Sequence, residues 1–173
     1  MLTTAAPTTH LGDDFRRAFR GHPAGVTIIT AHSRSGPVGI TSSSVSSVSA
    51  DPPILCFSLQ SLRGSAAAIA GASSLLVHLL TAENVALARR FAAPGTDGRF
   101  GPSTPWSPLP TGEPFVHGTG PVLRCTPLTT VAAGPALVVT TVVDAVLPSE
   151  SLAAPLVYQD RRYHCVSPWT ALD

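Results

Sequence analysis

The chain has 173 residues, which is the size of one ordinary domain, with 44% hydrophobic residues, only 12% charged residues and a formal net charge of +1. Its basic residues are all arginine and form no run longer than two, so the sequence lacks the electrostatic footprint of a nucleic-acid-binding protein. So little charge leaves an apolar surface, and we expect part of it to be buried in a homodimer.

The sequence shows no sign of export or of membrane insertion. The N-terminal segment has neither a basic region nor an apolar region of signal-peptide type. The longest apolar stretch, residues 136–147, is interrupted by polar side chains and is too short for a membrane span. We therefore expect a cytoplasmic protein without a membrane partner.

Cysteine and histidine are scattered along the chain. The three cysteines lie far apart, which predicts buried free thiols without a redox role. The six histidines form no ligand pair of metal-site spacing, so we predict no metal site. His78 stands alone in an apolar run and is expected to be a hydrogen-bonded core residue.

The chain begins with a Thr-, Ala- and Pro-rich segment, residues 1–12, which predicts a disordered tail before a single domain over residues 13–173. Asp13–Phe19 is predicted to be a short helix capped by one of its first two aspartates. Two β-branched runs, Val26–Thr30 and Val38–Thr41, predict a hairpin.

Residues 39–53 are the most unusual stretch, with seven hydroxyl side chains between Thr41 and Ser49. A serine-rich segment is commonly a flexible linker or a surface loop whose hydroxyls face water. Here it lies between two strand-like runs and has apolar positions of its own. An ordered loop or strand edge that presents hydroxyls and backbone N–H groups to a phosphate or a polar ring is the alternative.

The rest of the chain predicts further strands, a continuous apolar one over Ile54–Leu59 being expected to be buried on both faces. The other predicted strands are Leu75–Leu80, Val122–Pro127, Leu137–Leu147, Pro155–Tyr158 and Arg162–Val166. Two helices are predicted, Ser65–Ala72 and Glu83–Ala92. The Gly- and Pro-rich segment Pro94–Gly120 either lines a site or is an irregular surface excursion.

Ser65 is placed to be the N-cap of its helix. A capped helix N-terminus is a good seat for a phosphate, and Arg63 could add a positive charge there. Ordinary capping without a ligand is the alternative.

Residues 39–53 resemble the signature of the flavin reductase-like family, with Ser-Val-Ser-x-Asp-Pro-Pro intact at residues 47–53. Further similarity lies in Leu87–Ala92 and in the Arg-Tyr pair near the C-terminus, and it extends from about Phe15 to Val166. The resemblance implies a mainly β fold with peripheral helices, an antiparallel, closed and roughly six-stranded FMN-binding split barrel, in a homodimer.

The resemblance also implies FMN or FAD as cofactor, NADH or NADPH as co-substrate and a flavin-dependent monooxygenase as a possible partner. The expected flavin-binding residues are Thr41, Ser42, Ser43, Ser44, Ser47, Val48, Ser58, Arg63, Ser65 and Phe91. No catalytic acid or base is expected, because the cofactors themselves carry the hydride chemistry.

One departure from the family matters for function. Reductases of the family commonly have Gly-Asp-His where this chain has Gly134-Pro135-Ala136, and that histidine is associated with the nicotinamide nucleotide. The first hypothesis is an NAD(P)H-dependent flavin reductase that supplies reduced FMN or FAD. The alternative is a flavin-binding protein or redirected flavoenzyme that does not use NAD(P)H. A dimeric barrel without flavin is a third possibility, which the retained serine-rich loop opposes.

Overall fold

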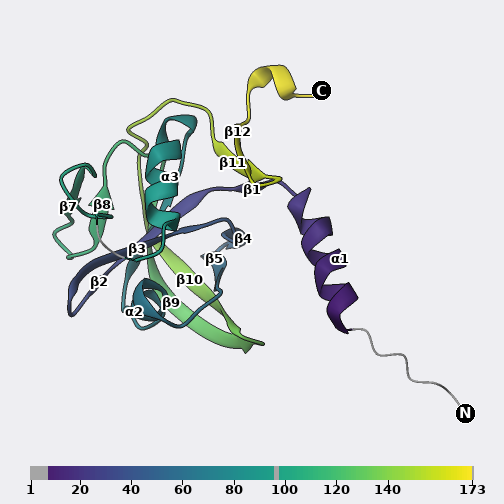
Figure 1. Ribbon diagram of the computed structural model, residues 1–173. Helices are drawn as coiled ribbons and strands as arrows, with labels where there is room; N and C mark the ends of the chain where they lie inside the picture. Colours follow the sequence, from purple (N-terminus) through teal and green to yellow (C-terminus); the bar gives the residue numbers. More distant parts are fainter. Residues whose placement is uncertain (1–7, 96–97, 173) are drawn as a thin grey trace, which may run out of the picture.

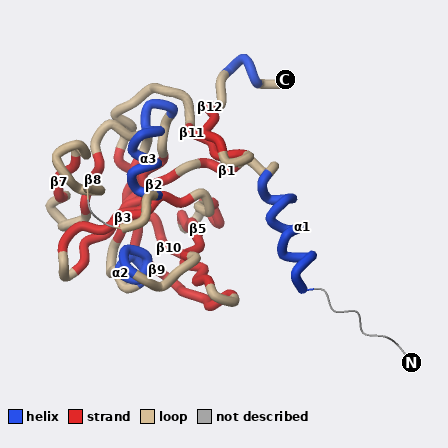
Figure 2. Tube along the Cα trace, viewed as in Figure 1, coloured by secondary structure: helices blue, strands red, loops and turns tan. Residues whose placement is uncertain are grey.

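The computed structural model describes residues 8–95 and 98–172, and these residues form a mainly β protein with few helices (Figure 1, Figure 2). The helical elements are α1 (Thr8–Arg20), α2 (Gly64–Ala70), η1 (Ala82–Asn84), α3 (Val85–Ala92) and η2 (Pro168–Thr170). None of these helices is long and apolar enough to cross a membrane.

Seven antiparallel strands make the main sheet. In spatial order they are β3 (Gly36–Ser42), β2 (Thr27–Ser33), β6 (Leu75–Leu79), β9 (Val122–Ala133), β10 (Ala136–Leu147), β5 (Pro53–Leu59) and β4 (Ser46–Ala50). The edge strands β3 and β4 do not pair within the described residues, so the expectation of a closed six-stranded barrel was wrong. Residues 43–45 nevertheless join one edge of the sheet directly to the other, and we call them the seam loop.

Two smaller sheets flank the main one. The first has the order β1 (Ala24–Gly25), β11 (Leu156–Gln159) and β12 (Arg162–Cys165), and the second pairs β7 (Trp106–Pro108) with β8 (Pro114–Val116). The segment 94–120, for which a site-lining loop and an irregular surface excursion were the alternatives, contains a short hairpin. Strands of three residues that begin or end at proline give too little alternation to be predicted.

Buried side chains lie on both faces of the central strands, since consecutive residues such as Ile28 and Ile29 of β2 belong to separate core clusters. In the first cluster, Phe57 of β5 lies with Ile29, Val77 and Val139 of other strands and with Ile69 of α2. Along β5 the buried positions alternate with half-buried ones, so the expectation that this strand is buried on both faces was wrong. The face of β5 that carries Ser58 borders cavities instead of core.

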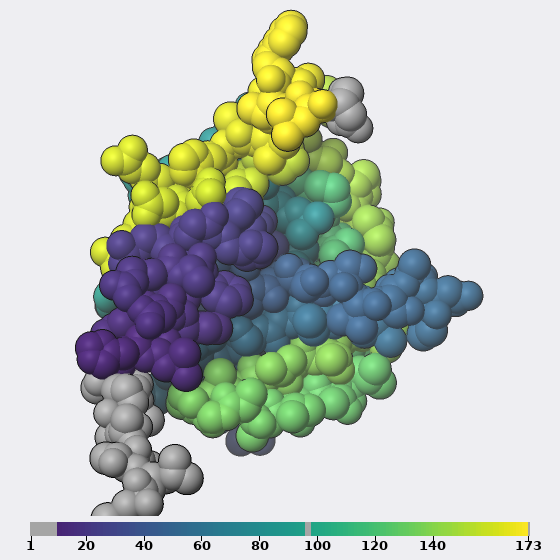
Figure 3. Space-filling model, turned by 90° about the vertical axis from the view of Figure 1, so that its right-hand side faces the viewer, coloured from purple at the N-terminus to yellow at the C-terminus, as the bar shows by residue number. Residues whose placement is uncertain are grey.

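Helix α1 is longer than expected, and it extends from the body of the protein (Figure 1). Asp13 and Asp14 lie inside it and pair with Arg16 and Arg17, so neither aspartate is the predicted cap. The predicted tail overlaps the helix at residues 8–12, and residues 1–7 lie outside the described part. Figure 3 shows α1 on the same face as the C-terminal strands and the hairpin of β4 and β5.

The three cysteines are free, as expected, but only Cys125 is fully buried. Cys56 is half-buried and Cys165 is exposed. Cys165 is exposed because it ends a short strand whose side chains are mostly exposed. The expectation that all three thiols are buried was therefore wrong for this residue.

His78 is a core residue, as expected. Its Nδ1–H donates to the carbonyl of Ile28 at 3.2 Å, and its Nε2 accepts from the Val116 N–H at 3.0 Å. The N–H of Val116 requires an unprotonated Nε2, which fixes the neutral tautomer. Complete burial lowers the pKa of His78 to about 4, against the opposing effect of the hydrogen bond to Ile28.

The depressed pKa of His78 predicts a pH-dependent stability. Between pH 6.5 and 4 the unfolded chain protonates this imidazole and the folded chain does not. Acidification through this window should therefore remove up to about 3 kcal/mol of stability in the wild-type protein. His78→Asn should flatten the dependence, as measured by urea unfolding at several pH values. His32→Asn, on an exposed histidine, is the control; an unchanged pH slope in His78→Asn would contradict the assignment.

Candidate functional site

The seam loop is held by its own serines. The Ser42 hydroxyl accepts from the Ser44 N–H at 3.2 Å and lies 3.0 Å from the Ser44 hydroxyl. The Ser44 Oγ in turn accepts from the Ser58 N–H at 2.9 Å. These bonds tie the seam to β5, so the serine-rich stretch is an ordered strand edge here and is not a flexible linker.

A cavity of about 390 Å³ opens beside the seam loop, and we call it the hydroxyl cavity. It is lined by Ile40, Thr41, Ser42, Ser43, Ser44, Ser58, Leu59, Gln60, Ser61, Ala66, Phe91, Ala92 and Arg99. Six of the ten residues expected to bind flavin are in this lining, from three separate parts of the sequence. The cavity presents neutral hydroxyls above an aromatic side chain.

The other four expected residues do not line the hydroxyl cavity. Ser47 and Val48 lie on the exposed edge strand β4, and Arg63 is exposed in front of α2. Ser65 was expected to cap α2, but Arg63 occupies the N-cap position and Ser65 lies inside the helix. The Ser65 hydroxyl instead accepts a hydrogen bond from Arg99, which is why it does not bond to its own helix.

Arg99 is the wall residue that the sequence did not reveal. Its Nη1 donates to the carbonyl of Gly39 at 2.7 Å and to the Ser65 hydroxyl at 3.0 Å, and its Nη2 donates to the carbonyl of Ala93 at 2.6 Å. The residue is only 8% exposed, and burial lowers the pKa of its guanidinium. Its buried Nε finds no hydrogen-bond acceptor within the described residues. Only its place between a glycine and a phenylalanine in a loop hinted at a role.

Gly39 permits the close packing of α3 on β3. A Cβ at this position would lie 2.6 Å from Cε1 of Phe91, too close for any side chain. The Thr41 hydroxyl donates to the carbonyl of Ala88 at 2.6 Å and fixes the same contact. Phe91 therefore forms a rigid part of the cavity wall.

A wider depression of about 920 Å³, the open trough, continues from the hydroxyl cavity. The two share Ser43, Ser44, Ser58 and Gln60. The far side of the trough is made by Phe15 and Phe19 of α1 and by the turn after β11, among others. Together they form one continuous surface with hydroxyls at one end and aromatic rings at the other.

The Gly134-Pro135-Ala136 turn lies close to this surface. Leu137 pairs with Leu59, so continuation of the antiparallel register places Ala136 opposite Gln60. Gln60 lines both the hydroxyl cavity and the open trough. A longer polar side chain at position 136 would thus start near the mouth of the cavity.

These residues fit a flavin. Several hydroxyls, a guanidinium with an unpartnered buried N–H and a phenyl ring suit a large planar ring with many acceptors and a phosphate. Among the described residues, no group of three or more His, Cys, Asp or Glu side chains is placed to hold a metal ion.

Comparisons with known proteins identify the family of the chain. A family model described as flavin reductase like domain matches residues 19–167. The NADH:FMN oxidoreductase of Rhodococcus erythropolis is 41% identical over 158 residues, covering 90% of this chain and 82% of that protein. A flavin reductase domain protein from an Arthrobacter species superposes with a TM-score of 0.83 at 31% identity, covering 94% of this chain and 99% of that one.

A third likeness is to nitrilotriacetate monooxygenase component B from Mycobacterium thermoresistibile. The TM-score is 0.86 at 25% sequence identity, and the alignment covers 96% of this chain and 93% of that chain.

The two neighbouring serines of the seam loop should respond differently to substitution. Ser43 is exposed to the cavity and its hydroxyl has no hydrogen bond to any described residue, so Ser43→Ala should weaken flavin binding and leave thermal stability unchanged. Ser44→Ala strands the N–H of Ser58 and should lower stability by about 1 kcal/mol. Flavin titration and thermal unfolding measure the two effects. Equal flavin affinity in Ser43→Ala and wild type would show that the Ser43 hydroxyl faces solvent and does not contact the flavin.

Proposed function

Because this chain belongs to the flavin reductase-like family, we propose that it is an NADH-dependent flavin reductase that produces reduced FMN or FAD. The observation that carries the proposal is the hydroxyl cavity, in which the seam loop, β5, α3 and Arg99 meet. The name of the Rhodococcus relative, an NADH:FMN oxidoreductase, supports both the flavin and the nicotinamide.

The flavin, when bound, accepts the hydride and supplies the redox chemistry. The protein's contribution is to bind and orient. Ser43 offers an exposed hydroxyl, and Phe91 and Arg99, both nearly buried, form part of the cavity wall. The open trough leaves one side of such a ring accessible to a second planar molecule. No side chain needs to move a proton for hydride transfer, so the lack of a catalytic acid or base is no obstacle.

The structure of the functional unit is part of the proposal. We propose that residues 13–173 form one domain with the family's split barrel, since residues 43–45 bring the two edges of the sheet together. We also propose a homodimer. Leu128, Val131 and Val146 on β9 and β10 are 56%, 55% and 64% exposed, and Phe15 and Phe19 on α1 are 60% and 58% exposed. Apolar side chains of this kind are favoured in subunit interfaces.

The dimer can be tested in solution. Sedimentation velocity at micromolar concentration should show a species of twice the chain mass of 17.8 kDa. Val131→Glu with Val146→Glu should shift it toward monomer, because burying two added carboxylates is unfavourable. His32→Glu, on an exposed residue, is the matched control. A wild-type protein that sediments only as monomer would refute the dimer.

We propose that the reduced flavin is used by a flavin-dependent monooxygenase. The likeness to a monooxygenase component B supports this step. A cytoplasmic location belongs to the same proposal and rests on the sequence alone.

The second candidate is a flavin-binding protein that does not use NAD(P)H. Its support is the turn at residues 134–136, where proline lacks a backbone donor and alanine offers no polar group near Gln60. The two candidates share the same flavin cavity and differ only in the nicotinamide step.

A double substitution separates them. The wild-type protein should oxidise NADH when FMN is added, and Pro135→Asp with Ala136→His should lower the apparent KM for NADH about tenfold. A histidine beside Gln60 would add one hydrogen bond or stacking contact to the nicotinamide nucleotide, about 1–1.5 kcal/mol. The effect belongs in KM because the contact acts in binding.

Pro135→Asp alone is the control for loss of the proline. If the purified protein shows a flavin spectrum on titration with FMN but neither form oxidises NADH or NADPH, the second candidate holds. If no flavin binds at all, both candidates fail.

A further inference from the structure

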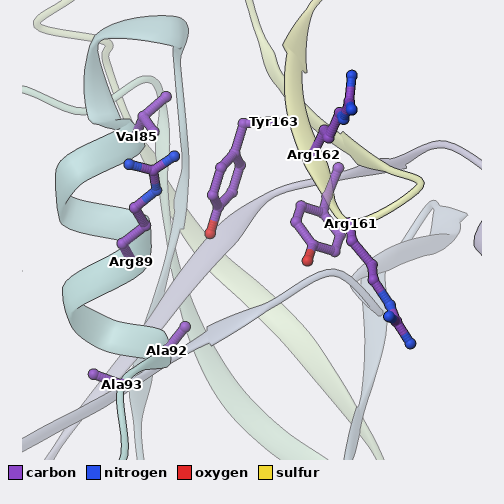
Figure 4. Close-up of a pocket in the computed structure, with 8 residues that line it drawn as sticks. Val85, Arg89, Ala92, Ala93, Arg161, Arg162 and Tyr163 are labelled. Atoms are coloured by element: carbon purple, nitrogen blue, oxygen red, sulfur yellow. The ribbon is translucent and has the colours of Figure 1, made fainter.

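A further cavity lies outside the hydroxyl cavity, between α3 and the hairpin of β11 and β12 (Figure 4). Its volume is about 620 Å³, and we call it the arginine–tyrosine cavity. It is lined by Val85, Arg89, Ala92, Ala93, Tyr158, Arg161, Arg162 and Tyr163. Three of these side chains are cationic, two are phenols and none is acidic.

Two tyrosine rings make one wall of this cavity. The rings of Tyr158 and Tyr163 are 5.1 Å apart and tilted by 58°. The guanidinium of Arg89, on α3, lies 5.7 Å from the centre of the Tyr163 ring. Burial raises the pKa of Tyr163, so its hydroxyl is a proton donor at neutral pH. The wall therefore combines two tilted aromatic rings with hydrogen-bond donors.

The three arginines have no counter-ion. Within residues 8–95 and 98–172, no carboxylate lies within 4.0 Å of the guanidinium of Arg89, Arg161 or Arg162. Figure 4 shows Arg89 against Tyr163, and Arg161 and Arg162 leaving the opposite wall in different directions. Both of the latter are exposed and can rotate toward the cavity. Unpaired guanidinium groups around one cavity favour an anion, and their planar forks suit phosphate oxygens.

The backbone at Arg161 adds to this picture. Arg161 has φ 62° and Asp160 has φ 47° in the tight turn between β11 and β12. A side chain in this left-handed region costs about 1 kcal/mol relative to glycine. The chain thus holds a guanidinium at the rim of the cavity in a conformation that glycine would adopt with less strain.

The arginine–tyrosine cavity adjoins the proposed flavin site on two sides. Ala92 lines both it and the hydroxyl cavity. Tyr158 and Arg161 line both it and the open trough. A ligand with its reactive ring beside the seam loop can therefore extend into this cavity, provided that it is longer than a mononucleotide.

We propose that the arginine–tyrosine cavity binds the phosphate-bearing adenosine half of a dinucleotide. This inference rests on the proposed function, in which two such molecules occur, FAD and the nicotinamide co-substrate. Both carry the same ADP group, with a diphosphate for the arginines and an adenine ring for the tyrosine wall.

ADP alone is the direct probe. Isothermal titration at low salt should show ADP binding to the wild-type protein and much weaker binding of adenosine, which lacks the phosphates. Arg161→Gly should weaken ADP binding about tenfold or more, the size expected for one charge-assisted contact. Glycine accepts the positive φ, so this variant keeps the turn and the fold. Arg89→Gln is a second variant on the opposite wall and should weaken ADP binding similarly.

Arg34→Gln is the matched control, because Arg34 is exposed between β2 and β3 and lines none of the three cavities. It should bind ADP like wild type. FMN affinity should be the same in Arg89→Gln and Arg34→Gln as in wild type, since FMN has no adenosine half and neither arginine lines the hydroxyl cavity or the open trough.

The source of the ADP group follows from two further measurements on Arg161→Gly. A raised KM for NADH with FMN as acceptor assigns the cavity to the co-substrate, whereas a raised Kd for FAD assigns it to the flavin. The inference is overturned if the wild-type protein does not bind ADP, or if both arginine variants bind ADP as tightly as wild type does. It is also overturned if Arg161→Gly changes neither the KM for NADH nor the Kd for FAD. ADP binding is measured without turnover, so a protein that binds ADP but fails to reduce FMN would refute the proposed function and leave the cavity assignment standing.

Discussion

The seam loop is the constraint on which the architecture depends. Only residues 43–45 separate β3 from β4, so the chain from Ser42 to Ser46 can span at most about 14 Å. A flat sheet of seven strands would place its two edges about 29 Å apart, at a spacing of roughly 4.8 Å per strand. The main sheet must therefore curl until its edges approach each other. The hydroxyl cavity lies at this junction because the backbone groups there are not all used by strand pairing.

Arg99 fixes the second wall of the same junction. One guanidinium donates to a carbonyl on β3, a hydroxyl on α2 and a carbonyl just after α3, and so adds hydrogen bonds between three elements that already pack together. A buried charge needs partners for its donors, and here three bonds are made, while Nε has no acceptor among the described residues. Gly39 completes the arrangement by letting Phe91 lie directly on β3. The walls of the hydroxyl cavity are thus held by contacts within the protein, and these contacts do not depend on a bound ligand.

The sequence predicted well what depends on local periodicity. The runs predicted to be strands became β2, β3, β5, β6, β9, β10, β11 and β12, and the resemblance to the family is supported along residues 19–167. Prediction from the sequence failed where a side chain bonds to a residue that is distant in the chain. Ser65 was expected to be a cap because its partner Arg99 lies far away in the chain, and only the flanking glycine and phenylalanine distinguish Arg99 from other loop arginines. Local sequence patterns also could not predict whether the sheet closes, because closure depends on whether two edge strands meet in space.

The serine-rich stretch shows why a structural and a functional interpretation need not exclude each other. Thr41, Ser42 and Ser44 use their hydroxyls within the protein, on α3, on the seam and on β5. Ser43, between them, is turned to the cavity without a partner among the described residues. A loop made only of free hydroxyls would be too mobile to select a ligand, because ordering it on binding would cost conformational entropy. Internally bonded serines on either side remove that cost in advance, so the number of hydroxyls in the sequence exceeds the number that can touch a cofactor.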